Sequence, residues 1–205
     1  MLTIVDYGVG NLASIKNMLK KTGNDALISS DPDIVSQADK LILPGVGAFD
    51  TCAEKLRQSG LIGILNKKAL EQNTPVLGVC VGMQLLMEGS EEGSLPGLGW
   101  IKGRVIKFRQ EKLPPGWKIP HMGWTDIVTT RPSPLFEGMY AEPRFYFVHS
   151  YHPDPANNED VLVEADYGYT FAAGLEHGNI TGVQFHPEKS HKFGLRLLSN
   201  FVSNY

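Results

Sequence analysis

Residues 75 to 86 of this chain read Pro75-Val76-Leu77-Gly78-Val79-Cys80-Val81-Gly82-Met83-Gln84-Leu85-Leu86. The first half joins a proline to an apolar, β-branched run, which predicts a strand that is covered on both faces. From Met83 onward the apolar spacing becomes helical. The segment therefore predicts a buried strand, a tight turn that carries a cysteine, and the start of a helix.

Cys80 lies between two glycines in the pattern Gly-x-Cys-x-Gly, which is the cysteine form of a nucleophile elbow. Gly78 and Gly82 suit such a turn because it leaves little room for Cβ atoms beside the nucleophile. The start of the following helix favours the thiolate form of the thiol. A cysteine in an apolar run is more often a small core residue, and we interpret Cys52 in this way. For Cys80 the flanking glycines favour a nucleophile, because core packing does not require them.

The composition limits the class of protein. The chain has 205 residues, so we expect a single domain over residues 1–205. It has 42% hydrophobic and 20% charged residues and a formal net charge of -3, which gives no signature of nucleic-acid or anionic-membrane binding. Two cysteines without a Cys-x-x-Cys pattern favour a reducing compartment, and no apolar run reaches the roughly 20 residues of a membrane span. We therefore expect a cytoplasmic protein.

Strands and helical patterns alternate along the first 90 residues. The expected strands lie at residues 2–5, 26–28, 40–43 and 76–79. The expected helices begin near residues 12, 31, 48, 61 and 83. This alternation predicts an α/β fold in which right-handed βαβ units form a parallel sheet, with the active site at the carboxyl ends of the strands.

The third expected strand runs into Pro44-Gly45-Val46-Gly47-Ala48-Phe49, where two more glycines stand between a strand and a helix. In a parallel sheet Gly47 and Cys80 would share one edge. An oxyanion formed by attack of Cys80 needs amide donors about 3 Å away. The amides of Val81 and of residues 46–47 are the candidates, although turn formation alone would also account for the glycines.

Glycine and proline become frequent after residue 92, and short strands replace the helical patterns. These strands are expected at residues 105–108, 125–128, 144–148, 162–165, 171–175 and 181–184, before a closing helix near 190–202. The change predicts an antiparallel extension of the same domain.

A base for Cys80 is found in Ile180-Thr181-Gly182-Val183-Gln184-Phe185-His186-Pro187-Glu188. Residues two apart in extended backbone project to the same side, so Glu188 can reach the imidazole of His186. Together these residues supply the nucleophile, base and orienting acid of acyl transfer. His149 and His152 have a His-x-x-His spacing but no third ligand nearby, so we expect no metal site.

Three segments together resemble the triad-type class I glutamine amidotransferases. They are residues 44–47, 78–82 and 186–188. The resemblance covers essentially the whole chain and implies a three-layer α/β fold with a mostly parallel central sheet, helices on both faces and an antiparallel extension. It also implies that Cys80 attacks the side-chain amide of L-glutamine, that His186 protonates the departing ammonia, and that water releases glutamate from the thioester. It implies no cofactor.

Within that family, four segments resemble the glutaminase subunits that supply ammonia for imidazole glycerol phosphate synthesis in histidine biosynthesis. They are residues 6–11, 44–49, 120–124 and 147–151. Thr125 stands where those subunits usually have Asn, which affects no catalytic residue. By this resemblance Gln84 and Glu92 would bind the α-amino and carboxylate end of glutamine, with backbone of Ser150 and Tyr151.

The same resemblance implies a partner. It is a (β/α)8 cyclase subunit, HisF-like, which would form a heterodimer with this chain and use the ammonia to make imidazole glycerol phosphate and an aminoimidazole carboxamide ribotide. The candidate docking residues are Asn11, His121, Met122, Trp124 and Lys189.

Three alternatives stay open from the sequence. A glutaminase subunit of another pathway, such as pyridoxal phosphate synthesis, would share the triad, although residues 7–11 and 148–151 argue against it. A cysteine hydrolase of the α/β-hydrolase type would share Gly-x-Cys-x-Gly, but that fold places its acid well before the histidine. An inactive binding subunit would not need all three triad residues.

Overall fold

The structure is a computed structural model that describes residues 1–205. Its strands are β1 (Leu2–Val5), β2 (Leu27–Ser29), β3 (Lys40–Gly45), β4 (Val76–Cys80), β5 (Gly103–Lys107), β6 (His121–Thr129), β7 (Arg144–His149), β8 (Tyr151–Pro155), β9 (Val161–Asp166), β10 (Thr170–His177) and β11 (Ile180–Val183). Nine of them form one sheet in the order β2-β1-β3-β4-β11-β10-β9-β6-β7. The other two, β5 and β8, pair with each other.

The first part of the sheet is parallel. Strands β2, β1, β3, β4 and β11 pair side by side in one direction, which confirms the expected βαβ organisation. Every residue of β1, β4 and β11 is buried. Such strands have helices on both sides, so they read as continuous apolar runs rather than as alternating patterns.

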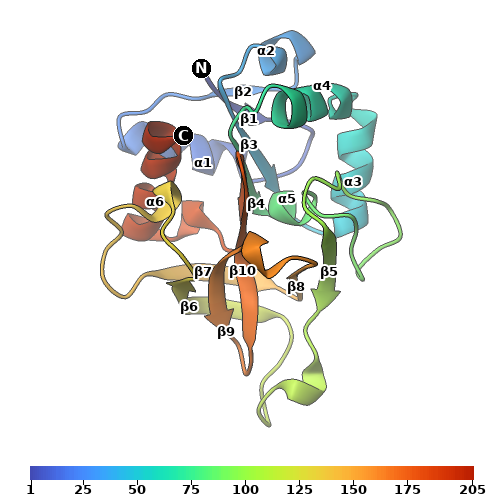
Figure 1. Ribbon diagram of the computed structural model, residues 1–205, viewed down its shortest axis with the longest axis vertical. Coiled ribbons are helices and arrows are strands. Elements are labelled where there is room, and N and C mark those ends of the chain that lie inside the picture. The colour runs from blue at the N-terminus through green and yellow to red at the C-terminus, as the bar shows by residue number, and fades with distance from the viewer.

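Two groups of helices cover the parallel strands. The helices are α1 (Leu12–Lys21), α2 (Pro32–Ser36), α3 (Phe49–Gln58), α4 (Ile62–Asn66), α5 (Val81–Gln84) and α6 (His191–Asn204), and a π-helical turn (Lys67–Glu71) continues α4. Figure 1 shows α1 and α6 on one face of the sheet and α3 and α4 on the other. The apolar stripe of α6, formed by Phe193, Leu197, Leu198 and Phe201, is buried against the sheet. The expected three-layer arrangement is thus confirmed.

The second part of the sheet is antiparallel. Strands β10, β9, β6 and β7 extend it from β11 onward, as expected for the region after residue 92. One strand differs from the expectation: β11 belongs to both parts, because it pairs parallel with β4 and antiparallel with β10. The last strand of the chain therefore lies in the middle of the sheet.

The cysteine turn leads into a shorter helix than the spacing predicts. α5 ends at Gln84, although the apolar pattern continues through Met87. The carbonyl oxygens of Leu85 and Leu86 accept hydrogen bonds from the amides of Leu98 (2.7 Å) and Ile101 (3.0 Å) instead of from the next helical turn. Contacts with this later segment thus override the local helical pattern.

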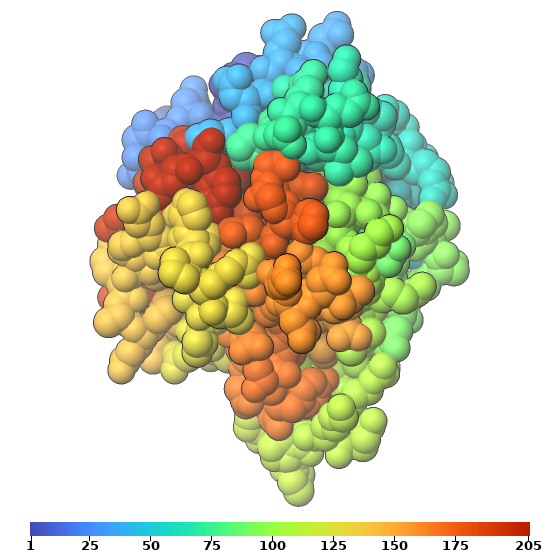
Figure 2. Space-filling model, viewed as in Figure 1, coloured from blue at the N-terminus to red at the C-terminus, as the bar shows by residue number.

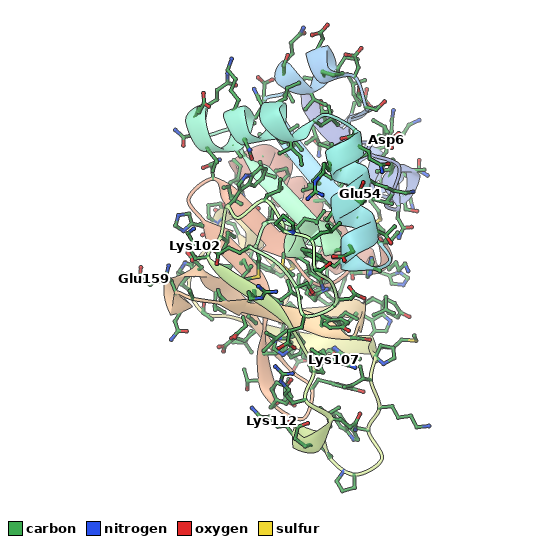
Figure 3. The ribbon with its side chains drawn as sticks, turned by 90° about the vertical axis from the view of Figure 1, so that its right-hand side faces the viewer. Asp6, Glu54, Lys102, Lys107, Lys112 and Glu159 are labelled. Carbon is green, nitrogen blue, oxygen red and sulfur yellow. The ribbon has the colours of Figure 1, made fainter.

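The segment between β5 and β6 projects from the body of the molecule. Figure 2 shows it at the lower end of the molecule, and Figure 3 places Lys107 where it begins and Lys112 toward its far end. The turn between β9 and β10 packs against it, because a Cβ on Gly168 would come within 2.6 Å of Cδ of Pro114. None of the helices combines the length and the apolar character that crossing a membrane requires.

Candidate active site

The register of three adjacent parallel strands brings the predicted site together. Gly45 at the end of β3 lies opposite Cys80 at the end of β4. On the other side Val79 lies opposite Val183, so the residue after β11, Gln184, is next to Cys80. The carboxyl ends of β3, β4 and β11 thus form one edge, which is where open α/β sheets bind their ligands.

The turn at Cys80 has the strained geometry of a nucleophile elbow. Cys80 has φ 55° and ψ -116°, a region that side-chain-bearing residues rarely adopt. A Cβ on Gly82 would lie 1.9 Å from the carbonyl oxygen of Leu43, and one on Gly78 would lie 2.7 Å from Cα of Met83. The prediction that both flanking residues must be glycine is confirmed.

His186 is buried beside this turn and is fixed on several sides. Its Nδ1 and Oε1 of Glu188 are 2.8 Å apart. Its backbone amide donates to the carbonyl of Tyr146 (2.9 Å), and its own carbonyl accepts from Oγ of Ser190 (2.6 Å). Nε2 is buried and makes no hydrogen bond within the chain. The carboxylate thus orients the ring and leaves Nε2 as the nitrogen for proton transfer.

The pKa values of His186 and Glu188 are shifted in opposite directions, and each shift favours the charged form of the side chain. Burial alone lowers the pKa of His186, but the hydrogen bond to Glu188 and the electrostatic influence of Cys80 and Glu188 outweigh it, so the pKa is raised. Burial alone raises the pKa of Glu188, but hydrogen bonds from His186 and Asn11 and the charge of His186 bring it below its ordinary value. The arrangement favours an imidazolium at His186 beside the carboxylate of Glu188.

A cavity of about 450 Å³ lies over these residues, within the size range of small-molecule sites. It is lined by Asn11, Val46, Gly47, Cys80, Val81, Gln84, Glu92, Pro120, Val148, His149, Ser150, Tyr151, His186 and Lys189. A second, more open cavity of about 680 Å³ adjoins it through Glu92, Ser150 and Tyr151 and extends along residues 107–111. The beginning of the projecting segment therefore forms part of the rim.

Both candidate oxyanion donors line the cavity. Val81 is the first residue of α5, and Gly47 has φ 97° with free space around the position of a Cβ. A hydrogen bond of 3.3 Å fixes the backbone before Gly47: the thiol of Cys52 donates it to the carbonyl oxygen of Val46. In a trans peptide the N–H points away from the C=O, so this contact directs the amide of Gly47 away from Cys52.

The predicted substrate-binding residues also meet at the cavity. Oε2 of Glu92 accepts a hydrogen bond from the amide of Phe49 (2.8 Å), which fixes the carboxylate at the start of α3. Gln84 is buried, and its Nε2 donates to the carbonyl of Tyr151 over 3.4 Å. The carbonyl of Ser150 accepts from the amide of Phe108 (3.0 Å).

One residue of the site was not predicted from the sequence. Gln184 is fully buried, and its Nε2 is 3.9 Å from Sγ of Cys80. Its Oε1 accepts from Nε2 of Gln84 over 3.0 Å. A polar residue at the end of an otherwise apolar strand, two positions before the proposed base, was the available signal.

The five candidate docking residues fall into three environments. Met122 and Trp124 project from the same face of β6 with 61% and 44% of their surface exposed. Asn11 and Lys189 line the cavity. His121 is only 2% exposed, and its Nδ1 is 2.9 Å from Nε2 of His149. The ring of His121 packs inside an aromatic cluster, so His121 is far less exposed than Met122 and Trp124.

Comparisons with known proteins agree with this geometry. A sequence model of the family "Glutamine amidotransferase class-I" matches residues 3–204. The chain belongs to the class-I glutamine amidotransferase family. One relative in this family is the imidazole glycerol phosphate synthase subunit HisH 2 of Methanococcus maripaludis, which is 49% identical over 98% of both chains. HisH 2 of Pseudomonas aeruginosa is 46% identical, again over 98% of both chains.

Solved structures show the same class-I amidotransferase fold. The chain resembles a structure of PurLQS from Thermotoga maritima with a TM-score of 0.74 at 17% identity, covering 99% of this chain and 97% of that one. A crystal structure of a glutamine amidotransferase gives a TM-score of 0.69 at 20% identity, covering 96% and 98%. Family membership also shows that the alternative of an α/β-hydrolase is wrong.

Proposed function

We propose that this class-I glutamine amidotransferase is the glutaminase subunit of an imidazole glycerol phosphate synthase. One observation carries the proposal: relatives 45–49% identical over essentially the whole chain are subunits of that enzyme. The cavity that holds Cys80, His186 and the carboxylate partner Glu188 agrees with it. Residues 1–205 would form one glutaminase domain, and the cytoplasmic location expected from the sequence stays a prediction.

In the proposed reaction, Sγ of Cys80 attacks the side-chain amide carbon of glutamine. The negative charge that develops on the carbonyl oxygen is received by the amides of Gly47 and Val81. Nε2 of His186, which makes no other hydrogen bond within the chain, gives its proton to the departing nitrogen, so ammonia leaves and a thioester remains. Water then attacks the thioester, His186 accepts a proton from that water, and the C–S bond breaks, which releases glutamate and frees the sulfur of Cys80. Glu188 keeps the ring in position throughout.

The ammonia would be passed to a (β/α)8 cyclase subunit rather than released. The exposed Met122 and Trp124 on β6 are residue types that are enriched in interfaces, and Asn11 and Lys189 connect this side of the molecule to the cavity. We propose these four residues as the docking face. Their position would place the partner over the mouth from which ammonia leaves.

The test is glutamate release from glutamine by the chain alone, and then with a cyclase subunit and its ribonucleotide substrate. We expect hydrolysis that increases strongly when the loaded cyclase is present, and no hydrolysis by Cys80→Ala in any mixture. Cys52→Ser is the matched control for loss of a buried thiol; it keeps a donor for the carbonyl of Val46 and should retain turnover. Stimulation by a pyridoxal synthase instead of the cyclase would assign the chain to that pathway, and turnover by Cys80→Ala would refute the nucleophile.

A further inference from the structure

Two buried amide side chains connect the sulfur of Cys80 to the substrate cavity. Nε2 of Gln184 is 3.9 Å from Sγ of Cys80, and Oε1 of Gln184 accepts from Nε2 of Gln84 over 3.0 Å. Nε2 of Gln84 also donates to the carbonyl of Tyr151 over 3.4 Å. We propose that Gln184 is a positioning residue that ties the nucleophile to recognition of the α-ammonium group of the substrate. This inference rests on the proposed glutaminase function.

The sulfur determines how both amides are oriented. A thiolate can only accept hydrogen bonds, so Gln184 must turn its NH2 group toward Cys80. Its carbonyl oxygen then faces Gln84, so Gln84 must donate a hydrogen bond to that oxygen from its own NH2 group. The two hydrogens of that group are used by Gln184 and by the carbonyl of Tyr151. Only the carbonyl oxygen of Gln84 is left for a ligand in the cavity.

The polarity of the cavity follows from this orientation. Gln84 offers an acceptor, and Glu92 offers the carboxylate oxygen that does not bind the amide of Phe49. Two acceptors on one side of a cavity bind a donor and repel an anion. Gln84 and Glu92 therefore favour the α-ammonium group of glutamine over its α-carboxylate.

A purely structural role does not account for Gln184. The side chain is completely buried, and an apolar residue of similar volume would fill the space without the cost of burying an amide. Both ends of the amide contact proposed functional groups, whereas the side chain of Thr181, on β11 three residues earlier, bonds only to the backbone of Val76. Thr181 is thus a matched control for loss of a buried polar group from β11.

The first test measures how alkylation of Cys80 by iodoacetamide depends on pH. The full chain is alkylated and the modified peptide is identified by mass spectrometry, which separates Cys80 from the buried Cys52. Gln184→Met keeps the volume and removes the donor, so we expect the pH midpoint of alkylation to rise by about one unit, with roughly tenfold slower reaction below it. Gln184→Glu, of the same size, should raise the midpoint further because it places a negative charge beside the sulfur.

Thr181→Val should leave the midpoint of Cys80 alkylation unchanged. If Gln184→Met does not fold, Gln184→Glu supplies the measurement, and circular dichroism establishes that each variant is folded. A midpoint equal to that of the wild-type chain in a folded Gln184 variant would overturn the proposed contact with the nucleophile.

The second test compares glutamine with glutaramate, which lacks the α-amino group, in the complex with the cyclase subunit. The wild-type chain should prefer glutamine, and the ratio of the two kcat/KM values should fall about tenfold in Gln184→Met, because Gln84 is no longer held with its oxygen toward the cavity. An unchanged ratio would refute the link to ammonium recognition. If wild-type protein released no glutamate at all, the proposed function itself would fail, which is a different result.

Discussion

Asn11 and Glu188 are joined by a hydrogen bond of 2.8 Å, from Nδ2 of Asn11 to Oε1 of Glu188. The same carboxylate oxygen lies 2.8 Å from Nδ1 of His186. Asn11 stands at the start of α1, so the first βα loop of the chain holds the acid of the proposed triad in place. The resemblance implies a docking role for Asn11, and in the structure its side chain contacts the acid of the proposed triad directly.

The first prediction concerns this contact. Asn11→Ala removes a donor from a buried carboxylate, which should let Glu188 and His186 reorient and should lower kcat for glutamine hydrolysis about tenfold or more. Asn24→Ala removes an asparagine at the other end of α1, where it bonds only to Thr22, and should change kcat little. Steady-state kinetics of both variants in the complex gives the comparison. Equal kcat values would show that the contact has no catalytic role.

Glu188→Gln gives a prediction about pH. The negative charge of Glu188 helps to raise the pKa of His186, so the imidazolium that protonates ammonia persists to higher pH. Without that charge the pKa falls, and the alkaline limb of the kcat profile should move to lower pH, with a loss of about 10² to 10⁴ in kcat from misorientation of the ring. Glu176→Gln is the control, because Glu176 has hydrogen bonds of its own to Ser133 far from the site. An alkaline limb that stays in place would contradict the assigned role.

A pair of glycine substitutions tests the packing at the elbow. A Cβ on Gly82 would lie 1.9 Å from the carbonyl oxygen of Leu43, so Gly82→Ala should lower the free energy of unfolding by more than about 3 kcal/mol or prevent folding. Gly63 lies in α4 with nothing within 4 Å of an added Cβ, so Gly63→Ala should raise it by about 0.5–1 kcal/mol. Urea unfolding of both variants measures the difference. A stable Gly82→Ala would mean that the turn is less confined than described.

The stability of the protein should fall in mild acid because of buried histidines around Phe108. Burial lowers the pKa of His121 to about 4 and that of His149 well below its ordinary value. Unfolded histidine titrates near 6.5, so between pH 6.5 and about 4 the unfolded chain binds protons that the folded chain does not. Above pH 6.5 the stability contributed by the neutral buried histidines is fully present. As the pH falls through the window, His121 alone should cost about 3 kcal/mol of unfolding free energy.

Urea unfolding at pH 7.5, 6 and 5 checks this expectation. In His121→Phe the free energy of unfolding should depend less on pH than in the wild-type chain, even if the variant is less stable at pH 7.5. In His191→Gln, at an exposed position, the free energy of unfolding should retain the full pH dependence. A wild-type chain that is equally stable at pH 5 and pH 7.5 would contradict the assignment of neutral buried histidines.

The sequence was most informative where local pattern and tertiary contacts agree. β4 and the turn at Cys80 follow from an apolar run and two glycines, and the parallel pairing of β1, β2, β3 and β4 follows from the alternation with helices. β8 was not predicted because Pro153 and Pro155 interrupt the strand pattern, and it forms because β5 pairs with it over residues 103–107. Such pairing between distant segments leaves no local signal.

In the site, too, some contacts can be predicted from local sequence and others depend on tertiary structure. The contact between His186 and Glu188 was predicted, but the extended backbone assumed for it is wrong, because Glu188 lies in a 3-10 helix over Pro187–Lys189. Gln184, Gln84 and Cys80 come from three elements, and only the register of β4 beside β11 brings them together. The burial of His121 was not predicted because an aromatic-rich strand gives no indication of which ring faces the interior.

The central position of β11 has a consequence for protein synthesis. This strand fills the gap between β4 and β10 and precedes the proposed base, yet it is synthesised after the other ten strands. A nascent chain that ends before residue 180 carries the thiol of Cys80 without its base and without the strand that unites the two parts of the sheet. Such sheets depend on contacts between distant residues and form late. Translation products that stop before β11 should therefore be unable to consume glutamine, and the chain becomes competent only after this strand and the proposed base have been synthesised.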